Sequence, residues 1–130
     1  MKIFDKVEGW QTKVNFVDEN NVVLGYDLTQ SCCEHADWFI ASRPRNNLPK
    51  WASFRDVKRP PVPDLTGWTF DTKYYKSLTG TGCGEDQIAI FKIVNGKKRK
   101  FIHIFNSHNG YYSHGFEFTN GEQKIMEGNL

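Results

Sequence analysis

Three Asn-Gly dipeptides in the last third of the chain constrain its fold more than any other feature. Asn95-Gly96, Asn109-Gly110 and Asn120-Gly121 each stand between runs of apolar and β-branched residues. Asn-Gly is the strongest short signal for a β-hairpin, because a type I′ turn requires positive φ at both of its central residues. Three such turns in succession predict a four-stranded antiparallel meander, and each turn fixes which residues lie opposite each other.

Two-residue loops at these dipeptides give a map of cross-strand neighbours. One face of the meander carries two largely apolar rows, Ile88–His103–Phe116–Ile125 and Ile90–Phe101–Phe118–Gln123. The other face carries Ala89, Phe91, Ile93, Ile102, Ile104 and Met126, with Glu117 opposite Lys124. Because both faces are substantially apolar, the N-terminal half must cover one of them. A sandwich, a small barrel, or a sheet with a helix laid across it would satisfy this requirement.

The N-terminal half contains one predicted hairpin and one predicted helix. Lys13–Asp18 and Val22–Asp27 alternate between apolar and polar residues and are joined by a short polar segment, which predicts two antiparallel strands. Ser31 and Glu34 have the spacing of a capping box, which predicts a short helix from about Cys32 to Ile40. A strand over residues 38–41 is the alternative.

The middle of the chain has less periodicity. Residues 43–66 hold all five prolines and are predicted to form a long basic loop, with one helical turn at Trp51 and Phe54. Gly67–Leu78 predicts one or two strands, and residues 79–85 predict a glycine-rich turn. The chain of 130 residues is therefore expected to be one domain of mainly β class, with α+β as the alternative.

Charge and cysteine content narrow the setting. The net charge of +2 hides a balance of −4 in residues 1–42, +4 in each of residues 43–66 and 67–100, and −2 in residues 101–130. Three cysteines do not make a disulfide framework, so a reducing cytoplasm is expected. Neither a secretory signal nor a membrane-spanning run is visible, so no membrane partner is expected.

The neighbour map brings polar side chains together at one end of the meander. It places His103 and His114 diagonally, roughly 7–8 Å apart, with Glu127 beside His114. Two imidazoles and a carboxylate can bind a divalent metal ion or act as an acid–base pair. The simpler interpretation is that a histidine among phenylalanines packs as an aromatic side chain. No other cofactor is predicted.

A second concentration of reactive side chains lies at the predicted helix start. The amide dipoles there would lower the pKa of a thiol, so Cys32 or Cys33 could be a nucleophile. Free cysteines are more often small buried apolar residues, and this is the alternative. No Walker A loop, G-x-S-x-G, H-E-x-x-H or Rossmann fingerprint is present, so no catalytic residue is assigned.

Two segments have the composition of contact surfaces. The predicted hairpin tip at residues 107–114 carries His108, Tyr111, Tyr112 and His114, side chains suited to contact a planar ligand or a protein surface. The basic loop places Arg55 and other cations around Trp51, a combination that single-stranded nucleic acid binding uses.

Three segments also resemble one family. Residues 25–27, the run from Cys32 to Ile40, and residues 106–112 are similar to a family of small, uncharacterised bacterial and phage proteins that share a G-Y-D…C-C-E core and an N-G-Y-Y hairpin. The resemblance extends from about Lys13 to Phe118 and departs at the basic proline-rich segment. It implies a bacterial or phage origin and a small stand-alone protein, and it carries over no catalytic role.

The favoured hypothesis is a cytoplasmic, non-enzymatic binding module whose partner is another protein or a small ligand. One alternative is a small metal-dependent or thiol enzyme that uses the histidine–glutamate cluster or the cysteine pair. The other is a protein that binds single-stranded nucleic acid through the basic loop. The sequence leaves open whether the protein is a monomer or a homodimer.

Overall fold

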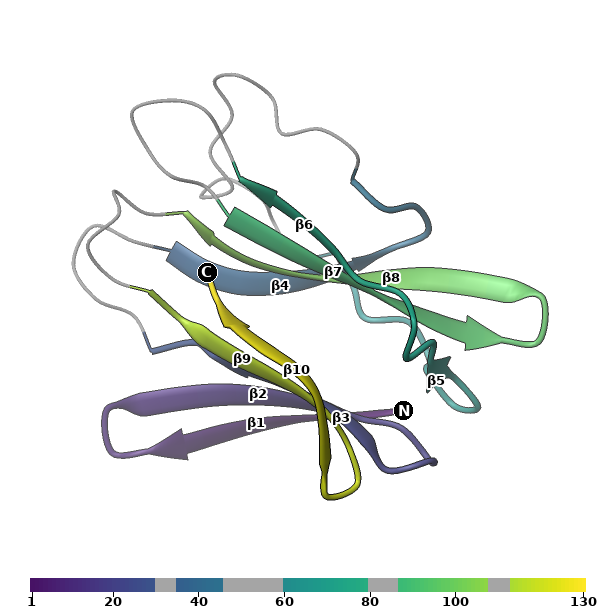
Figure 1. Cartoon of the computed structure of the whole chain (residues 1–130), viewed down its shortest axis with the longest axis horizontal. Helices are drawn as coiled ribbons and strands as arrows, with labels where there is room; N and C mark the ends of the chain where they lie inside the picture. The colour runs from purple at the N-terminus through teal and green to yellow at the C-terminus, as the bar shows by residue number, and fades with distance from the viewer. Residues whose placement is uncertain (30–34, 46–59, 80–86, 108–112) are drawn as a thin grey trace.

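The computed structural model describes residues 1–29, 35–45, 60–79, 87–107 and 113–130. In this part of the chain every regular element is a β-strand, and the strands form two antiparallel sheets that are stacked as a sandwich and not closed into a barrel (Figure 1). This confirms the prediction of a mainly β, sandwich-like fold. Within the same residues, no helix is long and apolar enough to cross a membrane.

The first sheet, sheet A, is built from both ends of the chain. Its strand order is β1-β2-β3-β9-β10. The strands are β1 (Lys2–Glu8), β2 (Gln11–Val17), β3 (Val22–Asp27), β9 (Gly115–Asn120) and β10 (Gln123–Asn129). The pairing of β3 with β9 joins the N-terminal strands to the C-terminal hairpin. The predicted hairpin of residues 13–18 and 22–27 is confirmed as β2 and β3.

The second sheet, sheet B, comes from the intervening residues. Its order is β4-β8-β7-β5, and β6 also pairs with β7. The strands are β4 (His35–Ala41), β5 (Thr69–Phe70), β6 (Lys76–Thr79), β7 (Gln87–Asn95) and β8 (Lys98–Ser107). The predicted strands in Gly67–Leu78 are confirmed as β5 and β6.

The predicted helix from Cys32 to Ile40 is wrong over its described part, which lies in β4. Trp38 and Ile40 belong to the core between the sheets, whereas Phe39 packs on the other face of sheet B. This alternation with a period of two residues is that of a strand, and β4 pairs along its whole length with β8. The capping-box residues lie outside the described residues.

The four-stranded meander is also wrong, because β8 belongs to sheet B and β9 to sheet A. The predicted pairs between residues 101–105 and 114–118 therefore do not form; β8 pairs with β4 and β7, and β9 with β3 and β10. The Asn109-Gly110 dipeptide itself lies outside the described residues. The local turn signal does not distinguish a hairpin within one sheet from a passage between two sheets.

The two outer Asn-Gly sites form hairpins, but their turns begin one residue later than predicted. Asn95 pairs with Lys98 and Asn120 pairs with Gln123, so the loops are Gly96-Lys97 and Gly121-Glu122. Only the glycine of each loop has positive φ, near +60°, as in a type II′ turn. The register of β7 on β8 is shifted by two residues, which preserves the faces, and Ile90 lies opposite His103.

The β9–β10 register differs further from the predicted map. A bulge between Lys124 and Met126 changes the pairing, so that Glu117 lies opposite Glu127 and Phe116 opposite Gly128. The predicted Phe116–Ile125, Phe118–Gln123 and His114–Glu127 neighbours are therefore wrong. A bulge of this kind inserts one extra residue into a strand and locally bends it.

The β7–β8 hairpin is apolar on both faces, as the sequence predicts, and both faces are buried. The side chains that face sheet A are Ala89, Phe91, Ile93, Ile102 and Ile104. Those on the opposite face are Ile88, Ile90, Phe101 and Phe105. None of these nine side chains is more than 3% exposed. Phe39 and Leu78 pack on the second set, so sheet B carries a core on each side.

Polar contacts also tie the sheets together. The Tyr26 hydroxyl on β3 donates a hydrogen bond of 2.8 Å to the Phe105 carbonyl on β8. Asp18, in the β2–β3 turn, is 5% exposed. Its Oδ1 accepts from the N–H groups of Asn20 and Val22, both at 2.9 Å, and its Oδ2 accepts from the Phe70 N–H of β5 at 2.8 Å. One carboxylate thus closes a turn of sheet A and holds it against sheet B.

We expect Asp18→Asn to lower the free energy of unfolding by about 2 kcal/mol. Both oxygens of Asp18 accept from backbone N–H groups, and the asparagine NH₂ would face one of these N–H donors without an acceptor. Urea unfolding measures this change. Asp64→Asn is the matched control, since exposed Asp64 uses a single oxygen to accept from Thr66 and asparagine retains that acceptor. Equal losses in the two variants would show that the contact with Phe70 does not stabilise the sandwich.

Candidate functional site

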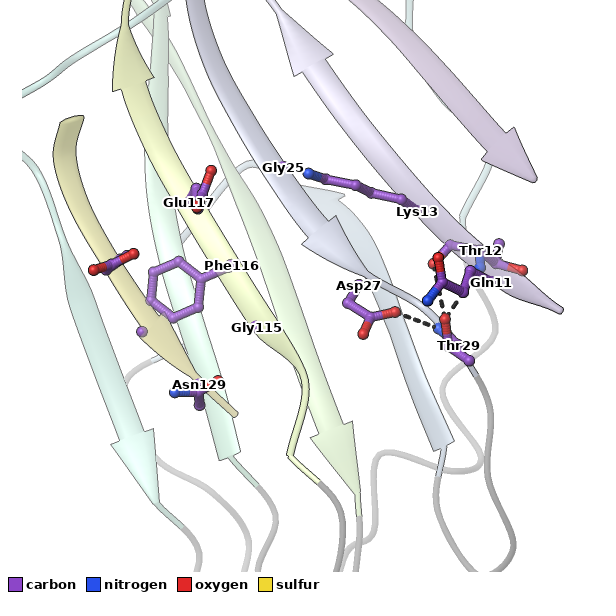
Figure 2. A pocket seen from close by; sticks show the side chains of 12 residues that line it. Gln11, Thr12, Lys13, Gly25, Asp27, Thr29, Gly115, Phe116, Glu117 and Asn129 are labelled. Carbon is purple, nitrogen blue, oxygen red and sulfur yellow. Dashed lines mark hydrogen bonds between the residues drawn. The ribbon is translucent and has the colours of Figure 1, made fainter. Parts of the chain in front are cut away.

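A polar trough crosses the outer face of sheet A, the face turned away from sheet B. Its volume is about 540 Å³, and it runs over β2, β3, β9 and β10 (Figure 2). The lining residues are Gln11, Thr12, Lys13, Gly25, Asp27, Thr29, Gly115, Phe116, Glu117, Glu127, Gly128 and Asn129. They come from sequence positions about 100 residues apart and meet because β3 pairs with β9.

Two glycines in the trough have different surroundings: the space at Gly25 is filled by neighbouring side chains, whereas that at Gly115 is open. Gly25 on β3 lies opposite Asn15 on one side and Glu117 on the other. A Cβ at Gly25 would lie 2.9 Å from both Asn15 Oδ1 and Lys13 Cε, so these two side chains occupy the space that a larger residue would take. A Cβ at Gly115 would meet only ordinary contacts, the nearest being Asn129 Oδ1 at 3.6 Å.

The charged side chains of the trough are predominantly acidic. Lys13 lies opposite Asp27, and Glu117 lies opposite Glu127. Directly opposed like charges on neighbouring strands are unfavourable. Lys124, outside the trough, forms an ion pair of 2.8 Å with Glu127 and offsets part of this repulsion. Among the lining residues, three carboxylates face a single ammonium group.

Several polar groups of the trough are available to a ligand. Within the described residues, the side chains of Lys13, Glu117 and Asn129 form no hydrogen bond or ion pair with the protein. Asp27 is different, because one of its oxygens accepts from the Thr29 N–H at 2.8 Å, and the Thr29 hydroxyl in turn accepts from the Thr12 N–H at 3.1 Å. These contacts fix the end of the trough (Figure 2).

A buried polar network lies beside the trough, between the sheets. The Nδ1–H of His114 donates to the Asp27 carbonyl at 2.6 Å, and the His114 backbone exchanges two hydrogen bonds with Leu130. The Leu130 carbonyl also accepts from Asn106 Nδ2 on β8 at 3.1 Å. His114 is therefore held by β3 and by the chain beyond β10, and it positions the start of β9, from which Gly115 and Glu117 extend.

His103 occupies a different place, on the face of sheet B that is turned away from sheet A. Its ring stacks on Phe39 with centroids 4.3 Å apart and an interplanar angle of 9°. Nδ1–H donates to the Phe101 carbonyl and Nε2 accepts from the Arg45 N–H, both at 3.2 Å. Burial is the main cause that lowers the pKa of His103 to about 4. The imidazole is thus neutral near pH 7.

The structure does not bring the predicted metal ligands together. His103 lies on sheet B, His114 lies between the sheets, and Glu127 is exposed on the outer face of sheet A. In the part of the chain that the structure describes, no three His, Cys, Asp or Glu residues form a group that could hold a metal ion. The pairing that suggested the cluster was that of β8 with β9, which does not form.

The other predicted site residues cannot be placed in this way. Cys32 and Cys33, the loop residues Trp51 and Arg55, and the hairpin-tip residues His108, Tyr111 and Tyr112 lie outside the described residues. The predictions of a reactive thiol and a basic aromatic loop remain predictions, as does an exposed hairpin tip at residues 108–112. His114, which was also predicted to contribute to that exposed tip, is only 2% exposed, so this part of the prediction is wrong. Sequence reasoning missed the trough, although a glycine inside the alternating strand of residues 22–27 is a known sign of close approach by another group.

Comparison with family models, curated proteins and solved structures finds no match to this chain. The family resemblance described from the sequence therefore stays a prediction. The site must be interpreted from its own geometry.

We expect acid to destabilise the fold through His103. Its pKa is about 4 in the folded protein and near 6.5 when unfolded, so between these values only the unfolded chain binds the proton. The contribution of neutral His103 to the free energy of unfolding is complete above pH 6.5. It is lost as pH falls toward 4, by about 3 kcal/mol at most. Urea unfolding of the wild type and His103→Phe across this range measures it. The variant keeps an aromatic ring and should show a shallower pH dependence; identical slopes would contradict the assignment.

Proposed function

We propose that this chain is a non-enzymatic binding domain whose trough on sheet A takes a small, hydroxyl-rich ligand that carries a positive charge. The observation that carries the proposal is the open polar floor at Gly115, bordered by the side chains of Lys13, Glu117 and Asn129, which have no partner among the described residues. Its volume of about 540 Å³ falls within the range of small-molecule sites.

The chemistry of the lining supports this class of ligand. Asp27, Glu117 and Glu127 outnumber Lys13, so the trough favours a cation over an anion. Lys13 supplies hydrogen-bond donors, and the amide of Asn129 supplies both donors and acceptors. Hydroxyl groups, which donate and accept, match such a mixed set. An amino sugar combines these hydroxyls with an ammonium group.

The setting that we propose is the cytoplasm of a bacterium. The support is the odd number of cysteines, three, together with the resemblance to small bacterial and phage proteins. A trough open to solvent and lined by polar groups gains little from apolar burial, so its affinity depends on hydrogen bonds and on charge. We therefore expect weak, salt-sensitive binding.

We expect glucosamine to shift the amide NMR signals of β3 and β9 at millimolar concentration, and Gly115→Val to abolish this shift. Valine suits a strand and its Cβ meets no close contact, but its methyl groups would fill the floor. Thr119→Val is the matched control, because Thr119 lies on the same strand outside the lining residues.

Glucose and glucuronate serve as neutral and anionic probes in the same titration. The proposed charge preference predicts that affinity falls in the order glucosamine, glucose, glucuronate. Equal shifts with all three sugars would contradict the role of the carboxylates. Shifts that Gly115→Val and Thr119→Val leave equally intact would place the binding site elsewhere.

A further inference from the structure

A second surface, independent of the trough, lies at the end of the β7–β8 hairpin. Four consecutive cations, Lys97, Lys98, Arg99 and Lys100, begin in its Gly96-Lys97 turn and continue into β8. On the β8 side, β4 pairs only as far as Phe101, so residues 98–100 have no second neighbouring strand; on the β7 side, β5 pairs up to Val94, the residue before the Asn95–Lys98 pair at the turn. The turn and the β8 edge of the hairpin therefore extend beyond the neighbouring strands of sheet B (Figure 1).

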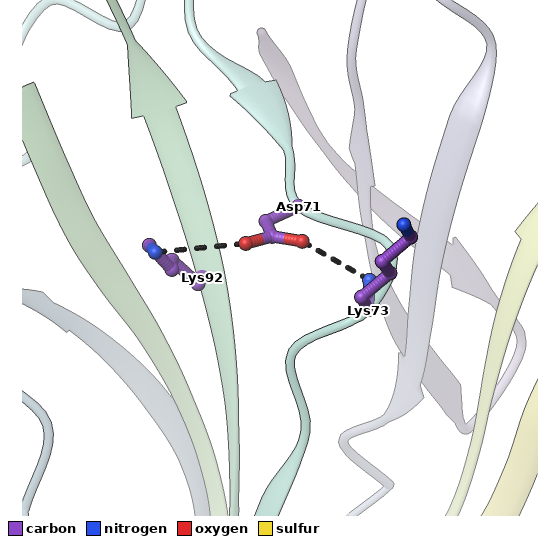
Figure 3. Close-up of polar contacts among 3 residues, drawn as sticks. All are labelled: Asp71, Lys73 and Lys92. Atoms are coloured by element: carbon purple, nitrogen blue, oxygen red, sulfur yellow. Dashed lines mark hydrogen bonds and ion pairs between the residues drawn. The ribbon is translucent and has the colours of Figure 1, made fainter. Parts of the chain in front are cut away.

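The cations at the tip are not neutralised by the protein. Lys97, Lys98 and Arg99 are exposed and form no ion pair within the described residues. Lys92, farther down the hairpin, shows the contrast, since its Nζ lies 3.5 Å from Asp71 Oδ2 (Figure 3). The Asp71 carboxylate is itself held by the Lys73 N–H at 3.1 Å. The Asp71 carboxylate thus neutralises Lys92 at the base of the hairpin, and the tip stays positively charged.

Strand alternation places these cations on both faces of the hairpin. Lys98 and Lys100 share the face of Ile102, whereas Arg99 shares the opposite face with Phe101. The Lys100 ammonium lies 5.7 Å from the centroid of the Trp68 ring, which orients it at the base of the tip. A hairpin that is positive on two faces can contact two negatively charged walls at the same time.

We propose that the β7–β8 hairpin inserts into the major groove of duplex DNA, with its cations on the phosphates of both groove walls. The major groove of B-DNA is about 12 Å wide and admits a two-stranded β-ribbon. The narrow major groove of an RNA duplex does not admit such an element, so the occupant is DNA.

The distribution of charge and apolar groups supports this choice. Residues 1–29 and 113–130, which supply sheet A, contain four Lys against eight Asp or Glu, whereas the described residues between them, 35–45, 60–79 and 87–107, contain nine Lys or Arg against three Asp or Glu. This asymmetry turns the sheet B side toward a polyanion. The tip of this hairpin carries no exposed large apolar side chain to enter a bilayer; those in the described part are Phe4, Val7, Trp10, Val62 and Tyr75.

The test is fluorescence anisotropy of a labelled 20-base-pair DNA duplex, titrated at several salt concentrations. Four phosphate contacts predict a slope of log K against log salt of about −3.6. We expect Lys98→Gln with Arg99→Gln to weaken binding by about tenfold or more at low salt and to reduce the slope by about 1.8. Lys2→Gln with Lys6→Gln removes the same charge from β1 and is the matched control, which should leave binding unchanged.

Four results would overturn the proposal. Equal weakening in both double variants would show that only net charge attracts the duplex. An RNA duplex bound as tightly as DNA would exclude insertion into the major groove. Preferential binding to anionic phosphatidylserine vesicles, or no binding to the duplex at 50 mM salt, would assign the hairpin to another role. Because the substituted side chains are exposed, we expect both double variants to remain folded, which circular dichroism can confirm.

Discussion

Two neighbouring strands that must bury both of their faces determine how the rest of this chain is arranged. Because the nine apolar side chains on β7 and β8 are buried, sheet B cannot be an open sheet with one solvent-exposed face. Sheet A covers one face of the β7–β8 pair, and Phe39, Leu78 and Tyr74 pack on the other. The outer face of sheet A, which has no such apolar load, is then free to be polar and to hold the trough.

Much of this fold follows from local patterns. Alternation predicts β2, β3, β7, β8 and their faces, and glycine after asparagine predicts where two hairpins turn. The turn type requires more than the dipeptide, because Asn95 and Asn120 end their strands and the following glycine alone takes positive φ. The choice between strand and helix at residues 35–40, and between one sheet and two for β8 and β9, depends on partners distant in sequence. Local patterns do not contain that information.

The candidate sites were predictable to a smaller extent for the same reason. A trough assembled from β2, β3, β9 and β10 requires the correct pairing of β3 with β9, which no short-range signal specifies. The histidine–glutamate cluster was inferred from a pairing that does not form. His103 and His114 instead form hydrogen bonds with backbone groups in two different parts of the sandwich. The basic run at residues 97–100 was visible in the sequence, but its projection beyond the sheet depends on where β4 and β5 end.

The division of sheet A between the two ends of the chain has a consequence for the order of folding. All strands of sheet B are contiguous in sequence, so that sheet can form while residues 115–130 are still unstructured. Pairing of β3 with β9 then closes a loop of about 90 residues, which is an entropically costly, non-local step. The trough straddles this closure. The trough is therefore complete only after β9 and β10 have paired with β3. A ligand bound in the trough would selectively slow the detachment of these two strands.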